Sequence, residues 1–196
     1  MTDKILNELN DEELILEFQK NNTIRAYEIL VDRYTNRLIN YVFRFLGEYE
    51  ACVDVVQETM IKVYRYKDSY NSIAKFSTWI YTIAGNLART EYQKRKRRKL
   101  FSINAAGDNK NENFEIPDEQ YRPDIITDSG IKDEIIQKAL LKVSDAYREV
   151  VILRDIQGLS YEEIAEITNT NVGTVKSRIN RGRGQLQKFL KGIYKE

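Results

Sequence analysis

The chain has 196 residues, of which 31% are charged and 42% hydrophobic, a composition that suits a globular protein with a substantial core. It contains no histidine and a single cysteine, Cys52, which excludes His-based catalytic and metal sites, internal disulfides and multi-cysteine clusters. The net charge is only +1, so any charged surface must come from segregation along the chain. We therefore expect no enzymatic activity and no metal or cofactor.

Two amphipathic helices are predicted in the first third of the chain. From Asn22 to Leu46, apolar residues recur with the 3.6-residue period of a helix, and Gly47 suits a left-handed C-cap. A second helix, from about Glu50 to Lys67, has an apolar side made of Val53, Val56, Met60, Val63 and Tyr64. Its opposite side carries Asp54, Gln57, Glu58 and Ile61. Like charges one turn apart destabilise a lone helix, so this side is either a solvated surface or a docking surface for a basic partner.

A third helix, from about Phe76 to Lys99, ends in six consecutive basic residues. Its apolar stripe comprises Phe76, Trp79, Ile80, Ile83 and Leu87, and the other side presents Thr78, Thr82, Gly85, Arg89 and Lys96, with Asn86 at the border. Six cations exceed what a helix dipole stabilises, and a polyanion would relieve their repulsion. Neighbouring aromatic rings could stack on unpaired bases, although Trp79 also suits a core position. The longest uncharged stretch, 13 residues from Phe76 to Ala88, is too short and too polar to cross a bilayer.

The segment that follows is predicted to be a linker. Both prolines of the chain, Pro117 and Pro123, lie between residues 101 and 130. The net charge is −6 over residues 1–58, +7 over 75–100, −6 over 101–137 and +6 over 171–196. We therefore expect an all-α protein with two helical domains, residues 1–100 and 131–196, joined by a flexible acidic linker over residues 101–130.

The second domain is predicted to contain a helix-turn-helix. Amphipathic helices are expected over residues 133–143 and 146–156, and Ser160 with Glu163 forms a capping box for a short helix. Asn171 suits the N-cap of a second helix, whose outer side carries Thr174, Lys176, Ser177, Arg178, Asn180, Arg181 and Lys188. A second helix of this kind enters the major groove in DNA-binding proteins, whereas the alternative is a helical hairpin with no role in DNA binding. Gly182 and Gly184 predict that this helix frays beyond Arg183.

Three segments resemble the sigma-70 family of bacterial RNA polymerase sigma factors. Residues 54–64 resemble its region 2.2, residues 76–86 resemble regions 2.3 and 2.4, and residues 158–165 with 172–179 resemble region 4.2. The order of these regions, with a linker between them and no room for regions 1.1 and 3, is that of the extracytoplasmic-function (ECF) type.

The resemblance implies a cytoplasmic subunit that binds core RNA polymerase, recognises the −35 and −10 promoter elements and melts the −10 region. Docking on the clamp helices of the polymerase largest subunit would involve Asp54, Gln57, Glu58 and Ile61, and the polymerase flap is a further implied contact. The −10 site would comprise Phe76, Trp79, Asn86, Arg89, Lys94 and Arg95, with the loop of residues 68–75 closing a pocket for a flipped base. The −35 site would comprise Arg154, Thr174, Lys176, Ser177, Arg178, Asn180 and Arg181. An anti-sigma factor is a further implied partner, and the acidic linker would thread through the polymerase channels.

Two other classes of function remain as alternatives. A stand-alone helix-turn-helix regulator would typically dimerise on a palindromic operator, and it would have no use for the surface of residues 54–61. A nucleic-acid-processing enzyme would need clustered carboxylates to hold a metal, whereas the acids here lie on solvated faces or in the linker.

Overall fold

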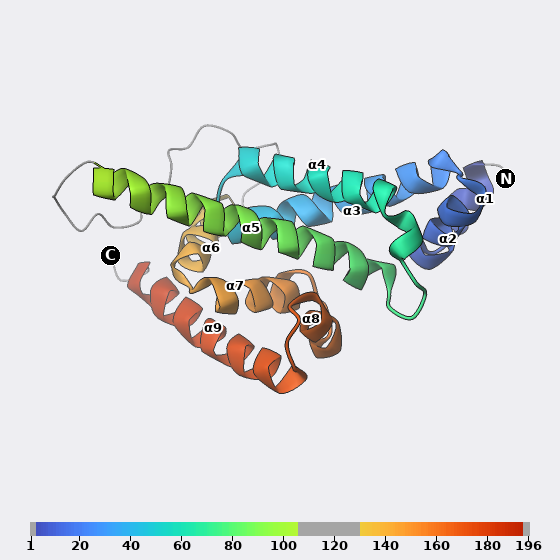
Figure 1. Ribbon diagram of the computed structural model, residues 1–196. Coiled ribbons are helices and arrows are strands. Elements are labelled where there is room, and N and C mark those ends of the chain that lie inside the picture. The colour runs from blue at the N-terminus through green and yellow to red at the C-terminus, as the bar shows by residue number, and fades with distance from the viewer. Residues whose placement is uncertain (1–2, 106–129, 194–196) are drawn as a thin grey trace.

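The computed structural model describes residues 3–105 and 130–193, and every regular element in these ranges is a helix (Figure 1). The N-terminal domain comprises α1 (Asp3–Glu8), α2 (Asp11–Asn21), α3 (Ile24–Leu46), α4 (Tyr49–Arg65), the 3-10 turn η1 (Lys67–Ser69) and α5 (Phe76–Ala105). The C-terminal domain comprises α6 (Gly130–Lys142), α7 (Asp145–Val151), the π-helical turn η2 (Ile152–Ile156), α8 (Tyr161–Ile167) and α9 (Val172–Ile193). The predicted all-α fold with two helical domains is confirmed, while most of the predicted linker, residues 106–129, lies outside the described residues.

Helix α3 forms the centre of the N-terminal domain and packs against α2, α4 and α5. Its core side chains are each at most 1% exposed, and they recur every three or four residues: Leu30, Tyr34, Leu38, Tyr41 and Phe45. Gly47 ends the helix with φ +79°, and its amide donates to the Phe43 carbonyl at 2.8 Å. The C-cap predicted from the sequence is therefore confirmed.

Helices α1 and α2 precede the first helix predicted from the sequence. Helix α2 begins with a capping box in which the Glu13 amide donates to Asn10 Oδ1 at 2.8 Å and the Asn10 amide donates to Glu13 Oε2 at 2.9 Å. Its buried side chains, Leu14, Ile15 and Phe18, join the core built around α3. This helix also holds the loop before α5.

The C-terminal domain folds around the pairing of α7 with α9. Gly182 of α9 lies where a Cβ would stand 2.6 Å from Val151 Cγ2 and 3.0 Å from the Tyr147 carbonyl oxygen. A side chain there would force α7 and α9 apart, so glycine permits their close approach. Helix α9 continues past both glycines to Ile193, and the predicted fraying beyond Arg183 stays a prediction that amide exchange would test.

The two domains pack against each other, with α6 to α8 lying along α3 and α5 (Figure 1). Arg148 is buried and donates from Nη1 to the Phe45 carbonyl at 2.7 Å, while Gln137 Nε2 donates to the Phe43 carbonyl at 3.1 Å. Both side chains therefore bind carbonyls at the C-terminal end of α3, the negative end of its dipole. Burial lowers the pKa of Arg148, although nearby Tyr92 opposes this effect.

Three residues lie on a different side from the one predicted. Thr78 is only 1% exposed and Gly85 is also buried, because helices of the C-terminal domain cover the side of α5 that was predicted to face solvent. Tyr64 is 45% exposed rather than buried, because it lies at the edge of the core, where its ring contacts Phe18 and Tyr27. Within the described ranges, no helix combines the length and the apolar character needed to cross a lipid bilayer.

Candidate nucleic-acid interface

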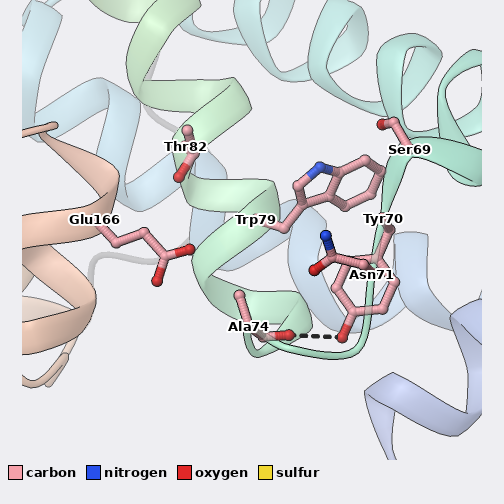
Figure 2. Close-up of a pocket in the computed structure, with 7 residues that line it drawn as sticks. All are labelled: Ser69, Tyr70, Asn71, Ala74, Trp79, Thr82 and Glu166. Carbon is pink, nitrogen blue, oxygen red and sulfur yellow. Dashed lines mark hydrogen bonds between the residues drawn. The ribbon is translucent and has the colours of Figure 1, made fainter.

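A pocket of about 220 Å³ opens between the loop before α5 and the first turns of that helix (Figure 2). The loop and helix contribute Ser69, Tyr70, Asn71, Ala74, Trp79 and Thr82, and Glu166 of α8 stands on the far side. The pocket thus combines an indole ring with hydroxyl and amide groups. A flat aromatic surface beside hydrogen-bonding groups can accept an unstacked nucleobase.

Helix α2 holds the loop that closes this pocket. Gln19 donates from Nε2 to the Lys67 carbonyl at 2.6 Å and to the Tyr70 carbonyl at 2.9 Å. Glu12 accepts the Phe76 amide at 2.9 Å, and a carboxylate suits the free N–H groups at the start of α5. The Tyr70 hydroxyl then donates to the Ala74 carbonyl at 2.9 Å across the loop (Figure 2). The pocket is therefore preorganised by contacts distant in sequence.

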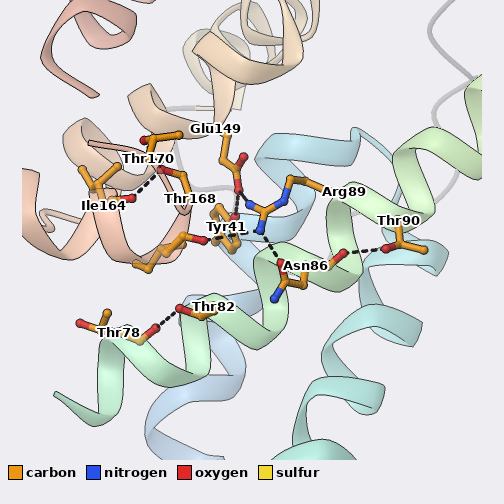
Figure 3. Close-up of polar contacts among 11 residues, drawn as sticks. Tyr41, Thr78, Thr82, Asn86, Arg89, Thr90, Glu149, Ile164, Thr168 and Thr170 are labelled. Carbon is orange, nitrogen blue, oxygen red and sulfur yellow. Dashed lines mark hydrogen bonds and ion pairs between the residues drawn. The ribbon is translucent and has the colours of Figure 1, made fainter. Parts of the chain in front are cut away.

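One turn beyond the pocket, α5 presents Asn86 and Arg89 (Figure 3). Arg89 Nη2 donates to Asn86 Oδ1 at 2.6 Å, and Arg89 Nη1 forms an ion pair with Glu149 of α7. The Tyr41 hydroxyl donates to the same Glu149 oxygen at 3.0 Å. Burial raises the pKa of the Glu149 carboxyl, and the charge of Arg89 works against that shift.

Farther along α5, the basic segment is partly engaged by acids. Arg95 forms a forked ion pair with Glu48, with Nη2 donating to Oε1 at 3.0 Å, and its Nε donates to Glu91 Oε1 at 2.9 Å. Burial alone would lower the pKa of Arg95, but the bonds to Glu48 and Glu91 outweigh it and raise the pKa. Lys94 lies 3.5 Å from Glu91 and remains exposed, as do the four basic residues that follow Arg95.

The helix-turn-helix forms as predicted. Ser160 and Glu163 make a reciprocal capping box at the start of α8, and the Asn171 side chain accepts the Thr174 amide at 2.7 Å at the start of α9. Asn169, with φ +48°, makes the turn between these helices. The outward residues of α9 are then exposed or half-buried: Thr174, Lys176, Ser177, Arg178, Asn180 and Arg181.

The ring of Tyr161 makes cation–π contacts with two basic side chains that are predicted to bind the −35 element. The Arg154 guanidinium lies 4.6 Å from the ring centroid, and Lys176 Nζ lies 5.4 Å from it. Arg154 also donates to the Leu159 carbonyl at 2.7 Å, which fixes its orientation. Residues from η2, α8 and α9 thus form one basic edge.

A third surface lies on the exposed side of α4. Asp54, Gln57, Glu58 and Ile61 are all exposed, and Ile61 is 42% exposed despite being a large aliphatic residue. Glu58 has an ion-pair partner in Lys62 at 3.6 Å on its own helix. The exposure predicted for this side of α4 is therefore confirmed, and its role in polymerase docking stays a prediction.

Phe76 differs from the other residues predicted for the −10 site. It is fully buried, and its ring meets Tyr34, Tyr70 and Trp79 at centroid distances of 5.3, 5.9 and 5.9 Å. A direct contact with DNA is therefore inconsistent with its position, and it instead supports Trp79 from behind. Three further residues line the pocket, although the sequence prediction did not assign them to the −10 site: Tyr70, Asn71 and Thr82. Tyr70 was among the aromatic residues expected to stack on bases, Thr82 was expected on the outward side of the helix, and only the predicted closing loop indicated Asn71.

The comparisons with known proteins agree with this arrangement. Residues 30–98 match the family "Sigma-70 region 2", and residues 133–186 match "Sigma-70, region 4". The ECF RNA polymerase sigma factor SigW of Bacillus subtilis (strain 168) is 36% identical over 170 residues, covering 86% of this chain and 90% of the relative. The ECF RNA polymerase sigma-E factor of Escherichia coli (strain K12) is 36% identical over 180 residues, covering 90% and 92%.

Solved structures resemble the fold over most of its length. The sigma factor RpoE in complex with the anti-sigma factor NepR from Bartonella quintana is 26% identical, with a TM-score of 0.64 over 85% of this chain and 98% of that one. CnrH in complex with the cytosolic domain of CnrY shares the fold at 22% identity, with a TM-score of 0.66 over 97% of both chains. Together with the two matched regions in order, these similarities show that the chain belongs to the sigma-70 family, as an RNA polymerase sigma factor of the ECF type.

Proposed function

We propose that this ECF sigma factor uses three separate surfaces in transcription initiation: α4 for polymerase, α5 with its preceding loop for the −10 element, and α9 for the −35 element. The protein itself carries out no chemical reaction in this role, and it acts in the cytoplasm, where it meets polymerase and promoter DNA. The pocket at the start of α5 carries the proposal, because it unites an aromatic ring, amide groups and a basic helix.

The −10 site is assigned to the pocket and the helix face beyond it. Trp79 would stack on a base extruded from the duplex, and Asn71 and Thr82 would contact its edge. Asn86 and Arg89 lie one to two turns farther along α5, where Arg89 could hold a neighbouring phosphate. Lys94 and Arg95 would extend this phosphate contact along the same helix.

The −35 site is assigned to the exposed side of α9. Arg178 and Lys176 can donate to guanine edges or phosphates, and Ser177 with Asn180 offers shorter polar groups for base contacts. Arg154 and Arg181, at the flanks of this surface, would contact phosphates. An α-helix in the major groove reads sequence through side chains of these types.

The docking assignment can be tested by capturing core polymerase with the purified sigma factor. The double variant Asp54→Lys, Glu58→Lys reverses two exposed charges one turn apart on α4, so we expect capture to fall sharply. The matched control, Glu28→Lys with Asp32→Lys, reverses two exposed acids at the same spacing on α3 and should capture normally. Equal capture by both double variants would contradict the docking assignment.

The structural neighbour bound to NepR motivates a further proposal, that an anti-sigma factor regulates this chain too. Such a partner would need to cover at least one of the three assigned surfaces in order to prevent initiation. Co-purification of the chain with a candidate partner, followed by loss of polymerase capture, would test the proposal. A partner that leaves capture and promoter binding unchanged would count against it.

A further inference from the structure

We propose that α2 makes the −10 pocket selective for its base, with Gln19 and Glu12 of α2 and Lys67 of η1 acting as positioning residues that fix the closing loop. The inference rests on the proposed −10 site and deepens it, because it assigns two properties of the pocket to different elements. Trp79 of α5 gives affinity for any stacked base, whereas the loop held by α2 gives the choice among bases. Loss of the bonds from α2 therefore lowers selectivity and leaves the stacking affinity in place.

The first support is a bonded contact between the C-terminal end of α2 and the start of the loop. Lys67 Nζ donates to the Phe18 carbonyl at 3.1 Å and to Asn22 Oδ1 at 2.6 Å, and it lies 4.1 Å from the centroid of the Phe18 ring. A cation suits this negative end of the α2 dipole. Asn22 ends α2 with φ +54°, a left-handed conformation that asparagine adopts more readily than most residues. The start of the loop is thus anchored to the end of a helix.

Gln19 fixes the main chain that carries the pocket residues of the loop. Its amide nitrogen has two N–H donors, and it bonds to two carbonyls three residues apart, those of Lys67 and Tyr70. The Tyr70 carbonyl belongs to the peptide group that joins Tyr70 to Asn71, so holding this carbonyl also holds the main chain of Asn71. Asn71 in turn lines the pocket beside Trp79 (Figure 2). The position of the Asn71 amide therefore depends on Gln19.

The second support is that α2 also holds the far end of the loop. Glu12, in the first turn of α2, accepts the Phe76 amide at 2.9 Å and so satisfies the first N–H group of α5. Glu12 and Gln19 are seven residues apart, which is close to two full turns, so they lie on the same side of α2 and about 10 Å from each other along its axis. One side of one helix thus holds the loop at both of its ends.

The third support is that the stacking ring and the reading groups of the pocket are held in different ways. The Trp79 ring belongs to α5 and packs against the buried rings of Tyr70 and Phe76, at centroid distances of 5.4 and 5.9 Å. Stacking on such a ring tolerates every base, because each base has an aromatic face. A choice among bases needs hydrogen bonds to the base edge, and Asn71 supplies an amide from the loop. If the loop loses its bonds to α2, these hydrogen bonds must also offset the cost of ordering the loop, and the preferred base loses its advantage.

The test measures base selectivity of the complex with core polymerase on a pool of single-stranded DNA of random sequence. Sequencing the bound and unbound DNA identifies the most selective position, and two oligonucleotides that differ only in that base then give the separate affinities. Gln19→Met keeps the length of the side chain but removes its N–H donors, so we expect the ratio of the two affinities to fall about threefold to tenfold. Affinity for the less favoured base should stay within about twofold of wild type, since stacking on Trp79 is retained.

Glu12 offers a matched pair of variants at the other end of the loop. Glu12→Gln keeps a side-chain oxygen that can accept the Phe76 amide, whereas Glu12→Met removes it, and both variants remove the same charge at similar side-chain length. We expect Glu12→Gln to select bases about as wild type does and Glu12→Met to lose about threefold or more of the affinity ratio. A difference in this direction isolates the hydrogen bond to Phe76 from the change in net charge.

Val42→Ala controls for a general loss of stability. It removes buried methyl groups from α3 about two turns beyond Tyr34, whose ring meets Phe76, so it should unfold at a lower temperature and keep wild-type selectivity. Wild-type selectivity in both Gln19→Met and Glu12→Met would overturn the proposal, and so would an equal loss of selectivity in Val42→Ala. A wild-type complex without base preference at any position would instead refute the proposed −10 site, and the inference with it.

Discussion

Two glycines of α9, only two residues apart, should respond oppositely to the same substitution. At Gly184, no atom lies within 4 Å of the position that a Cβ would take, so Gly184→Ala changes only the helix propensity of an exposed position. Alanine is favoured over glycine in a helix interior by about 0.8–1.0 kcal/mol. We therefore expect Gly184→Ala to raise the free energy of unfolding by about that amount.

Gly182→Ala gains the same helix propensity, but its new methyl group would collide with α7. The new Cβ would stand 2.6 Å from Val151 Cγ2, about 1 Å inside the usual contact distance of about 3.5–4.0 Å between carbon atoms. Val151 is buried and the Tyr147 carbonyl 3.0 Å away is main chain, so neither can move aside easily. Overpacking costs about 1–3 kcal/mol, which offsets the gain and leaves a net loss of up to about 2 kcal/mol.

Urea unfolding followed by circular dichroism measures both changes, and amide exchange in α7 and α9 locates them. The difference in unfolding free energy between the two variants should be about 1–3 kcal/mol, with Gly184→Ala the more stable. Exchange in α9 should quicken only in Gly182→Ala. If both alanine variants were stabilised equally, Gly182 would affect stability only through its low helix propensity, and the close approach of α7 to α9 would be disproved.

The remaining predictions concern the binding faces and the capping box. Arg178→Ala should reduce discrimination between correct and mutated −35 sequences by about 1–3 kcal/mol in competition binding, whereas unchanged preference would remove α9 from the reading role. Lys94→Ala should instead lower the slope of log affinity against log salt by about 1, with sequence preference intact. Ser160→Ala should cost about 1 kcal/mol in urea unfolding, because the Glu163 amide loses its acceptor. Burial acts to raise the pKa of the Glu163 carboxyl, but its bonds to Ser160 and Lys75 outweigh this effect and lower the pKa below 4.5. The ionised carboxylate therefore contributes fully to the folding free energy above pH 4.5, and this contribution is lost as the pH falls through the lowered pKa. Glu163→Gln should therefore flatten the acid side of the stability profile, and an unchanged profile would contradict this pKa direction.

The local elements could be predicted because short-range chemistry determines them. The capping box at Ser160, the N-cap at Asn171 and the C-cap at Gly47 each involve residues within a few positions of one another. The same signal occurs at Asn10 and Glu13, followed by Leu14 and Ile15, so α2 could have been predicted by the same rule.

The errors concern contacts between segments that are distant in sequence. Gly182 was interpreted by helix propensity alone, although its role depends on α7, some thirty residues earlier. Thr78 and Gly85 were assigned to a solvent-facing side, since helical periodicity distinguishes two faces but cannot say what covers the second. The pocket likewise depends on Gln19, which no motif connects with the loop it holds.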